Sequence, residues 1–270
     1  MPFVFRFVLV AAGGLLASAV AAQKRAVADA VLLPEAQAEL ALPGADYLLA
    51  TFNLVAPTSG GGATFAGAQL RLGYEHFWNE HWSAGATLRV LGGGGAGYGD
   101  FIGQDGSLTP GLLLRHRSRL GGFTLGQRLA AEYATTFDAA GRDRTLARLR
   151  LDAERAFPLG PRLALRPRLA YELAAYVRLL RAANDPEERA VDFGSLRAEV
   201  GLRLSPRLDL TPWAASQTRF ITSLPQYNSS GAQVGGGRTN LLTPLVGLDV
   251  RLMLGPSEGR AERQYLPTQH

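Results

Sequence analysis

The residues in this chain that could do chemistry are charged side chains that recur at every second position. In residues 144–154, Arg148, Arg150, Asp152 and Glu154 alternate with small or apolar residues. Residues 163–173 repeat the alternation, with leucines dominating one face. Because side chains on a β-strand point alternately to opposite faces, each stretch predicts a strand with one apolar and one charged face. A soluble sheet packs its apolar face into a core, whereas a transmembrane β-barrel turns that face to lipid and the charged face to its lumen.

Cysteine and histidine, which serve many catalytic and metal sites, offer no recognisable constellation. Cysteine is absent, which excludes a catalytic thiol, a thiolate metal site and a disulfide framework. The histidines are His76, His81, His116 and His270, at expected short turns or in the C-terminal tail, without metal-ligand spacing. Residues 92–97 formally match the glycine pattern of dinucleotide-binding loops, but no helix or βαβ unit follows. We therefore expect no enzyme, no cofactor and no bound metal.

The N-terminal region has the organisation of a targeting signal followed by a segment without alternation. Residues 1–22 contain Arg6, then an apolar run, then a small-x-small sequence that ends at Ala21, which is typical of a secretory signal peptide. Residues 23–45 are expected to form a periplasmic lead-in, or less readily a small plug. Within this segment, residues 35–42 are flanked by prolines and predict a helix of about two turns.

Residues 46–254 contain ten segments that each match one strand. Most are about 10–12 residues long, the length that a tilted strand needs to cross the hydrocarbon core of a bilayer. An even strand count would also place both ends of the barrel on the periplasmic side. The expected strands are residues 46–55, 67–77, 82–91, 108–117, 123–137, 144–154, 163–173, 193–204, 208–221 and 239–254.

The connections between these strands alternate in length. An outer-membrane barrel has short turns at its periplasmic end and long loops at its outer end. Its aromatic residues are enriched at the two levels of the lipid headgroups. Short turns are expected at residues 78–81, 118–122, 158–162 and 205–207, and longer connections at 56–66, 92–107, 177–192 and 222–238, with 138–143 as the short exception. Aromatic residues near the short turns are Phe77, Trp78, Trp82, Phe123 and Phe157, and those toward the long loops are Tyr133, Phe137, Tyr176, Phe193 and Phe220.

These features resemble a known class of membrane protein. The signal peptide, residues 67–90 with their aromatic turn at 78–82, and residues 126–220 with arginine and glutamate opposite leucine carry the resemblance. They are similar to the small bacterial outer-membrane β-barrels, and among these to the uncharacterised ones common in the Bacteroidetes. The chain departs from the class at its end, because such barrels commonly finish on an aromatic residue and here Leu254 precedes a polar tail.

The resemblance implies both a fold and a location. The fold would be an all-β, transmembrane, antiparallel up-and-down barrel of about ten strands over residues 46–254, with a polar periplasmic tail at 255–270. The location would be the outer membrane of a Gram-negative bacterium. Outer-membrane lipid, lipopolysaccharide and the barrel-assembly machinery would then be its partners, and we expect a monomer.

The charged face of each strand would line the lumen of such a barrel. Opposite charges on neighbouring strands can form ion pairs, whereas a buried unpaired charge is costly. The interior is therefore either structural and filled by salt bridges, as in narrow barrels, or a narrow porin-like pore whose arginine excess favours anions. The expected lumen-lining charged residues are Arg71, Glu75, Arg89, Arg115, Arg128, Glu132, Arg148, Arg150, Asp152, Glu154, Arg166, Arg168, Glu172, Arg197, Glu199, Arg203, Arg219, Asp249 and Arg251.

Other functions remain open on the sequence. An envelope enzyme or a ligand-binding barrel would act through its outer loops, and a soluble lipocalin-like binder would need no membrane. The net charge of +5 is spread along the strands rather than clustered, which argues against nucleic acid as a partner. The sequence thus favours a non-enzymatic outer-membrane barrel.

Overall fold

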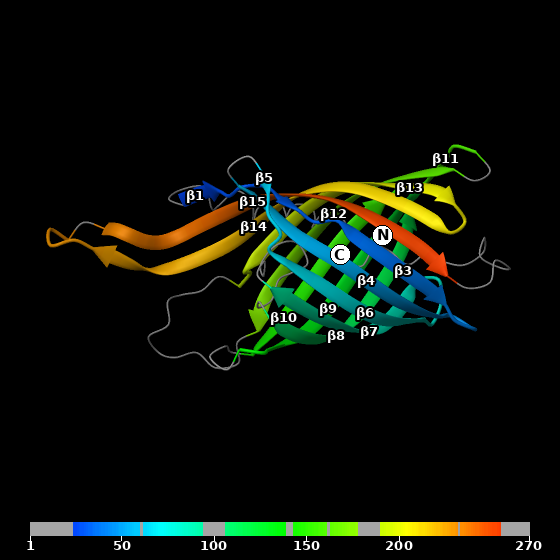
Figure 1. The fold of residues 1–270 in the computed structure, drawn as a ribbon, viewed down its shortest axis with the longest axis horizontal. Coiled ribbons are helices and arrows are strands. Elements are labelled where there is room, and N and C mark those ends of the chain that lie inside the picture. Colours follow the sequence, from blue (N-terminus) through cyan, green and yellow to red (C-terminus); the bar gives the residue numbers. More distant parts are fainter. Residues whose placement is uncertain are drawn as a thin grey trace, which may run out of the picture.

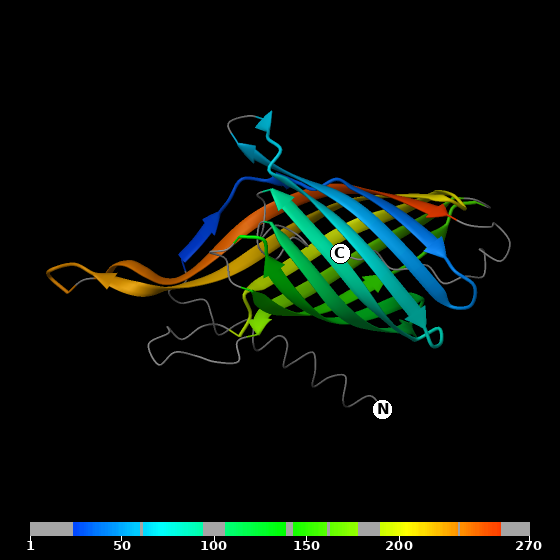
Figure 2. The same ribbon diagram turned by 60° about the horizontal axis from the view of Figure 1, so that its bottom comes forward.

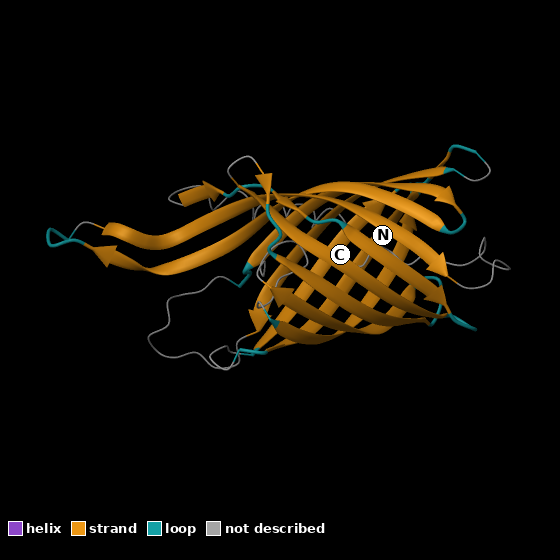
Figure 3. Cartoon of the chain, in the orientation of Figure 1, coloured by secondary structure: helices purple, strands orange, loops and turns teal. Residues whose placement is uncertain are grey.

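The structure is a computed structural model that describes residues 24–59, 62–93, 106–138, 143–160, 163–177, 190–231 and 233–254. These residues form a closed β-barrel of eleven strands. The strands are tilted, and the described chain contains strands and loops (Figures 1 and 3). Within them, no helix is long and apolar enough to span a membrane. The barrel strands are β3 (Glu35–Ala41), β4 (Asp46–Ser59), β6 (Gly67–Phe77), β7 (Trp82–Gly93), β8 (Ser107–Leu120), β9 (Phe123–Thr136), β10 (Arg144–Glu154), β12 (Ala164–Val177), β13 (Phe193–Ser205), β14 (Leu208–Tyr227) and β15 (Gln233–Leu254). Four short strands complete the sheet, namely β1 (Lys24–Val27), β2 (Val31–Leu32), β5 (Gly62–Ala63) and β11 (Phe157–Pro158).

Strand β3 closes the ring. From β4 round to β15 neighbouring barrel strands are antiparallel, whereas β3 is antiparallel to β4 and parallel to β15. Glu39, for example, stands opposite Leu49 on β4 and Met253 on β15. β1 and β2 also run parallel to β15. The all-β barrel class is therefore confirmed, but the prediction of ten purely antiparallel strands is wrong in number and in the direction of the closing pair.

The helix predicted at residues 35–42 is this closing strand. Its alanines, glutamates and leucine favour a helix locally. The same sequence also alternates, and in the structure Glu35, Gln37 and Glu39 turn into the barrel. Two free strand edges, on β4 and β15, supply hydrogen-bond ladders that a helix could not use. The segment is thus part of the barrel wall rather than a separate lead-in.

Short and long connections lie at opposite ends of the barrel, as the sequence predicts (Figures 1 and 2). We call these the short-turn end, at the right of Figure 1, and the long-loop end. The tight β8–β9 turn needs glycine, because Gly121 and Gly122 have φ values of 56° and 83°. Lys24 pairs with Thr239 toward the long-loop end, whereas β15 finishes at the short-turn end. The prediction that both barrel ends lie on one side is therefore wrong, since the strand count is odd.

Residues 222–238, predicted as a long loop, are mostly a continuation of two strands. β14 and β15 stay paired from Thr222 opposite Arg238 to Tyr227 opposite Gln233, with register shifts on the way. Figure 1 shows this hairpin projecting well beyond the rest of the barrel at the long-loop end. The glycine-rich composition that favours a loop instead accommodates irregular strand geometry, since Gly236 and Gly237 have positive φ values of 76° and 92°.

The apolar face of the barrel strands points outward and the charged face points inward, as predicted. The outward rows leave large aliphatic side chains 38–68% exposed, whereas the inward rows bury arginine and glutamate. This arrangement is the inverse of a soluble sheet with an apolar core. The outward aliphatic residues include Leu70, Leu72, Leu88, Leu112, Leu114, Leu129, Leu149, Leu151, Leu169, Leu196, Val200, Leu248 and Leu252.

The aromatic residues divide between the exterior and the interior. Phe77 and Phe193 are buried inside the barrel, where Phe77 meets Tyr47 with ring centroids 5.4 Å apart and Phe193 meets Tyr176 at 5.9 Å. The interfacial positions predicted for Phe77, Tyr176 and Phe193 are therefore wrong. Exposed aromatic residues at the short-turn end are Trp78, Trp82, Phe123 and Phe157, and those at the long-loop end include Tyr133 and Phe137.

Candidate functional site in the barrel lumen

The charged residues predicted to line the lumen occupy the inward face of the strands. Arg219 lies near the long-loop mouth, exposed, with its guanidinium 5.9 Å from the Phe193 ring centroid. Asp209, also inward and buried, belongs with this set. The others divide into a buried group and a partly buried group. The buried ones are Arg71, Glu75, Arg89, Arg115, Arg128, Arg148, Arg150, Arg168, Glu172, Arg197, Glu199, Asp249 and Arg251, and the partly buried ones are Glu132, Asp152, Glu154, Arg166 and Arg203.

One ion-pair network crosses the lumen from β12 to β15. Glu199 is shared by Arg168, whose Nε donates to it at 2.5 Å, and by Arg197, whose Nε donates at 2.7 Å. Arg197 also donates from Nη2 to Asp249 at 2.8 Å. The other Asp249 oxygen accepts a hydrogen bond from the Trp213 indole at 2.7 Å. Each buried carboxylate in this network therefore meets at least one guanidinium, as burial of charge requires.

Gly247 makes room for the indole in that network. A Cβ at this position would lie 2.3 Å from Cε2 of Trp213, closer than any real contact. The indole consequently lies over β15, with the Arg197 guanidinium 3.9 Å from its ring centroid. A glycine on an inward position thus allows one large ring to fill the space between strands.

A second network joins β7 to β12 and adjoins the first at β12. Glu132 accepts from Nη2 of Arg89 at 2.6 Å and lies 3.3 Å from Nε of Arg148. Arg148 also donates from Nη1 to Glu172 at 3.0 Å, and Arg128 donates to the same carboxylate at 2.5 Å. Alternating shared carboxylates and guanidiniums therefore connect four strands without leaving an isolated charge in this group.

The closing seam has its own polar cluster, which the sequence reading missed. Glu35 accepts hydrogen bonds from the side-chain amides of Gln37 and Asn53. Arg251 donates to Gln37 at 3.0 Å and lies 3.5 Å from Glu39. The signal that could have revealed this cluster is the alternation of polar and small residues in β3. Because that alternation covers only seven residues, the helix-forming composition outweighed it.

The long-loop end of the lumen is filled by apolar side chains instead. Val31, Leu33, Val55, Leu91 and Leu245 form a buried cluster there, together with Trp213. Val31 and Leu33 belong to the segment that precedes β3, so the first described part of the chain contributes to this filling. Close packing of aliphatic side chains leaves no room for water beside them.

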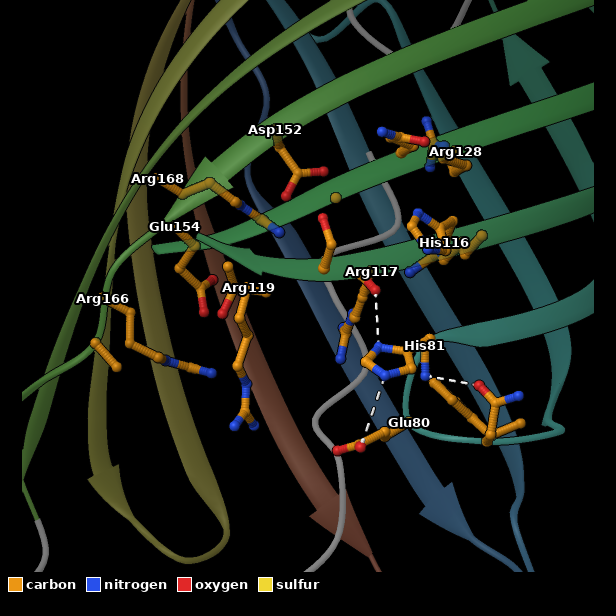
Figure 4. Close-up of a pocket in the computed structure, with 18 of the residues that line it drawn as sticks. Glu80, His81, His116, Arg117, Arg119, Arg128, Asp152, Glu154, Arg166 and Arg168 are labelled. Carbon is orange, nitrogen blue, oxygen red and sulfur yellow. Dashed lines mark hydrogen bonds and ion pairs between the residues drawn. The ribbon is translucent and has the colours of Figure 1, made fainter. Parts of the chain in front are cut away.

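The short-turn end contains a cavity of about 740 Å³, which we call the vestibule. Figure 4 shows Arg117 and Arg119 from β8, and Arg166 and Arg168 from β12, pointing into this space. Asp152 faces the same cavity from β10. Asp152 approaches β9 closely because Gly126 stands opposite, where a Cβ would lie 2.6 Å from the carboxylate oxygens.

Three of the four histidines, His76, His81 and His116, lie near the short-turn end. His81 places Nδ1 3.1 Å from the Arg117 carbonyl oxygen and Nε2 3.7 Å from Glu80. His76 places Nδ1 2.5 Å from Asp46. His270 lies outside the described residues. Within the part of the chain that the structure describes, no group of three or more histidine and acidic side chains could hold a metal ion.

Comparison with known proteins gives no family assignment. No protein-family model, no curated protein and no solved structure matches the chain. The resemblance to outer-membrane barrels therefore rests on the sequence pattern and on the geometry described above.

Proposed function

We propose that this chain is an integral outer-membrane β-barrel of non-enzymatic function, with a lumen closed by its own side chains. The observation that carries the proposal is the outward apolar face of the closed barrel. Leu112, for example, is 68% exposed although it lies on a regular strand. Its outward neighbours on the adjacent strands, Ala86 and Ala131, are aliphatic too. Soluble monomers rarely expose contiguous apolar patches larger than a few hundred Å². Lipid hydrocarbon is the environment that suits a continuous ring of such side chains.

The interior supports a closed barrel rather than an open pore. Gln69 is 0% exposed and Gln37 and Gln217 are each 2% exposed, although all three point into the lumen. A water-filled channel beside them would leave them accessible. The apolar cluster at the long-loop end and the ion-pair networks in the middle account for this lack of access. The barrel would therefore span the membrane without conducting.

A narrow pore that favours anions is the second candidate. The observation in its favour is the arginine excess in the vestibule, because rings of positive side chains select anions in pores. For this candidate to hold, the buried side chains between the vestibule and the long-loop end would have to move aside. Conductance in planar bilayers distinguishes the two candidates directly.

The experiment begins with full-length protein produced in a Gram-negative host. We expect the protein in the outer-membrane fraction. Like other folded barrels, it should migrate faster in electrophoresis before boiling than after. The same protein in planar bilayers should give no unitary current steps. Recovery in the soluble periplasmic fraction would contradict membrane insertion. Regular current steps with anion preference would contradict the closed lumen and support the anion-favouring pore. The secretory signal at residues 1–22 stays a prediction that the N-terminal sequence of the mature protein would check.

A further inference from the structure

The vestibule carries more positive charge than its own carboxylates balance. Eight arginines line it against three acidic residues. Several of these arginines also reach carboxylates deeper in the lumen: Arg115 reaches Glu75, Arg166 and Arg203 share Asp209, Arg168 reaches Glu199, and Arg128 reaches Glu172. Glu199 and Glu172 are in turn shared with Arg197 and Arg148, which lie outside the vestibule. Even with these deeper carboxylates counted, the vestibule keeps an excess of arginine over carboxylate.

Three of its arginines stand directly opposite one another on neighbouring strands. Arg115 on β8 is in register with Arg128 on β9, and Arg128 is in register with Arg150 on β10. Like charges placed directly opposite across a sheet destabilise it. Arg115 and Arg128 each meet a carboxylate, Glu75 and Glu172, whereas Arg150 has no such close partner. A row of three planar cations suits an anion that several of them contact at once.

Arg150, at the β10 end of this row, has an unsatisfied donor. Arg150 is 4% exposed, and its Nη2 donates no hydrogen bond to any residue that the structure describes. Its ion pair with Asp152 is long, with 3.9 Å between Nε and Oδ2. Buried donors in native proteins nearly always have a partner, because an unmade hydrogen bond leaves the desolvation cost uncompensated. An oxygen of a bound anion would supply that partner.

We propose that the vestibule binds a small phosphate-bearing anion, with Arg150 as its buried anchor and Arg117 and Arg119 as rim contacts. The forked guanidinium matches the oxygens of a phosphate group better than a point charge does. The cavity volume lies in the range of small-molecule sites. The binding itself does not depend on membrane insertion, since it concerns only the interior. Its orientation toward the periplasm rests on the proposed function.

The test uses full-length protein folded in detergent micelles and titrated calorimetrically with pyrophosphate, inorganic phosphate and succinate. Fold is checked by heat-modifiable migration, so that failure to bind is separated from failure to fold. We expect pyrophosphate to bind with a Kd below about 1 mM at low salt, more tightly than succinate, and to weaken as salt is raised. Membrane fractionation of the same protein reports on the proposed function independently.

Arg150→Gln should weaken pyrophosphate binding by about tenfold or more, because it removes a buried charged donor that has no other hydrogen-bond partner at Nη2. Arg144→Gln is the matched control. It changes the same residue type on the same strand, but at the long-loop end, where the guanidinium lies 5.0 Å from the Tyr176 ring centroid. Its Kd should equal that of the unaltered protein.

Arg119→Gln keeps the test decisive if Arg150→Gln does not fold. This side chain is exposed at the vestibule rim, so its replacement spares the buried networks. We expect about two- to fivefold weaker binding from the loss of one rim charge. Three results would each contradict the proposed site. They are no measurable pyrophosphate binding, equal affinity for pyrophosphate and succinate, or a loss of pyrophosphate affinity in Arg144→Gln as large as that in Arg150→Gln.

Discussion

The two ends of the lumen are closed in different ways. At the long-loop end, Leu245 and Val55 pack in a buried apolar cluster whose only polar link is the Trp213 indole. At the short-turn end, Arg115, Arg128 and Arg150 stand in one row beside a cavity. The first arrangement stabilises the barrel mainly by packing, whereas the second places three like charges in direct register. Regions that keep surplus charge at a cost to stability are where binding sites are expected.

The largest effect should come from the network between the two ends. Glu199 is shared by Arg168 and Arg197, so Glu199→Gln would leave two buried guanidiniums without their common carboxylate. We expect a loss of about 3–5 kcal/mol in unfolding free energy. Urea unfolding in detergent or lipid vesicles measures it. Glu80→Gln, at a side chain that is 72% exposed, is the control and should change stability by less than about 0.5 kcal/mol. Equal effects in the two variants would mean that the network does not hold the barrel together.

A smaller loss is expected at the long-loop end. Leu245→Ala would leave a cavity in the apolar cluster and should lower the unfolding free energy by about 2–4 kcal/mol. Leu248→Ala on the outer face of the same strand leaves no internal cavity and should cost clearly less. The same urea titration compares them. A larger loss for Leu248→Ala would indicate that the outer face, rather than this cluster, is the packed core.

The sequence predicts the faces of the strands better than the closure of the ring. Alternation over residues 144–154 and 163–173 depends only on local geometry, so the outward leucines and inward charges follow directly. The closing strand depends on a parallel pairing between Glu35–Ala41 and the end of β15, which are far apart in sequence. No local signal reports that pairing, and composition alone favours a helix there.

The vestibule was only partly predictable for a related reason. Alternation places Arg115, Arg128 and Arg150 in the lumen, but the number of residues in each turn sets their register, which makes them direct neighbours. The sequence therefore predicts them as lumen residues but does not predict the row. The hairpin over residues 222–238 was missed because glycine and serine favour loops locally, while pairing with a neighbouring strand overrides that preference.

Replacing Arg150, unlike the vestibule arginines that belong to the ion-pair networks, should not destabilise the barrel. Arg150→Gln relieves the repulsion from Arg128 directly opposite, so we expect stability to stay unchanged or rise by up to about 1 kcal/mol. The measurement is the urea midpoint in the absence of phosphate. A loss of stability similar to that of Glu199→Gln would show that the row belongs to the structural network, and the contrast between the two ends would disappear.

The smallest effect is expected in the projecting hairpin. Leu224 and Tyr227 are each 63% exposed beyond the barrel. The double variant with Leu224→Ser and Tyr227→Ser should change the unfolding free energy by less than about 0.5 kcal/mol. A substantial loss would mean that the hairpin packs against something and is not a free extension of the strands.

The central claim is that the outward leucines face lipid. Because the chain has no cysteine, a single introduced cysteine can carry a fluorescent label at a defined place. In vesicles, a label at Leu112→Cys should be quenched by nitroxide-bearing lipid chains and protected from aqueous iodide. A label at Arg119→Cys, on the same strand at the vestibule rim, should show the reverse. Iodide quenching with no lipid quenching at position 112 would contradict the account.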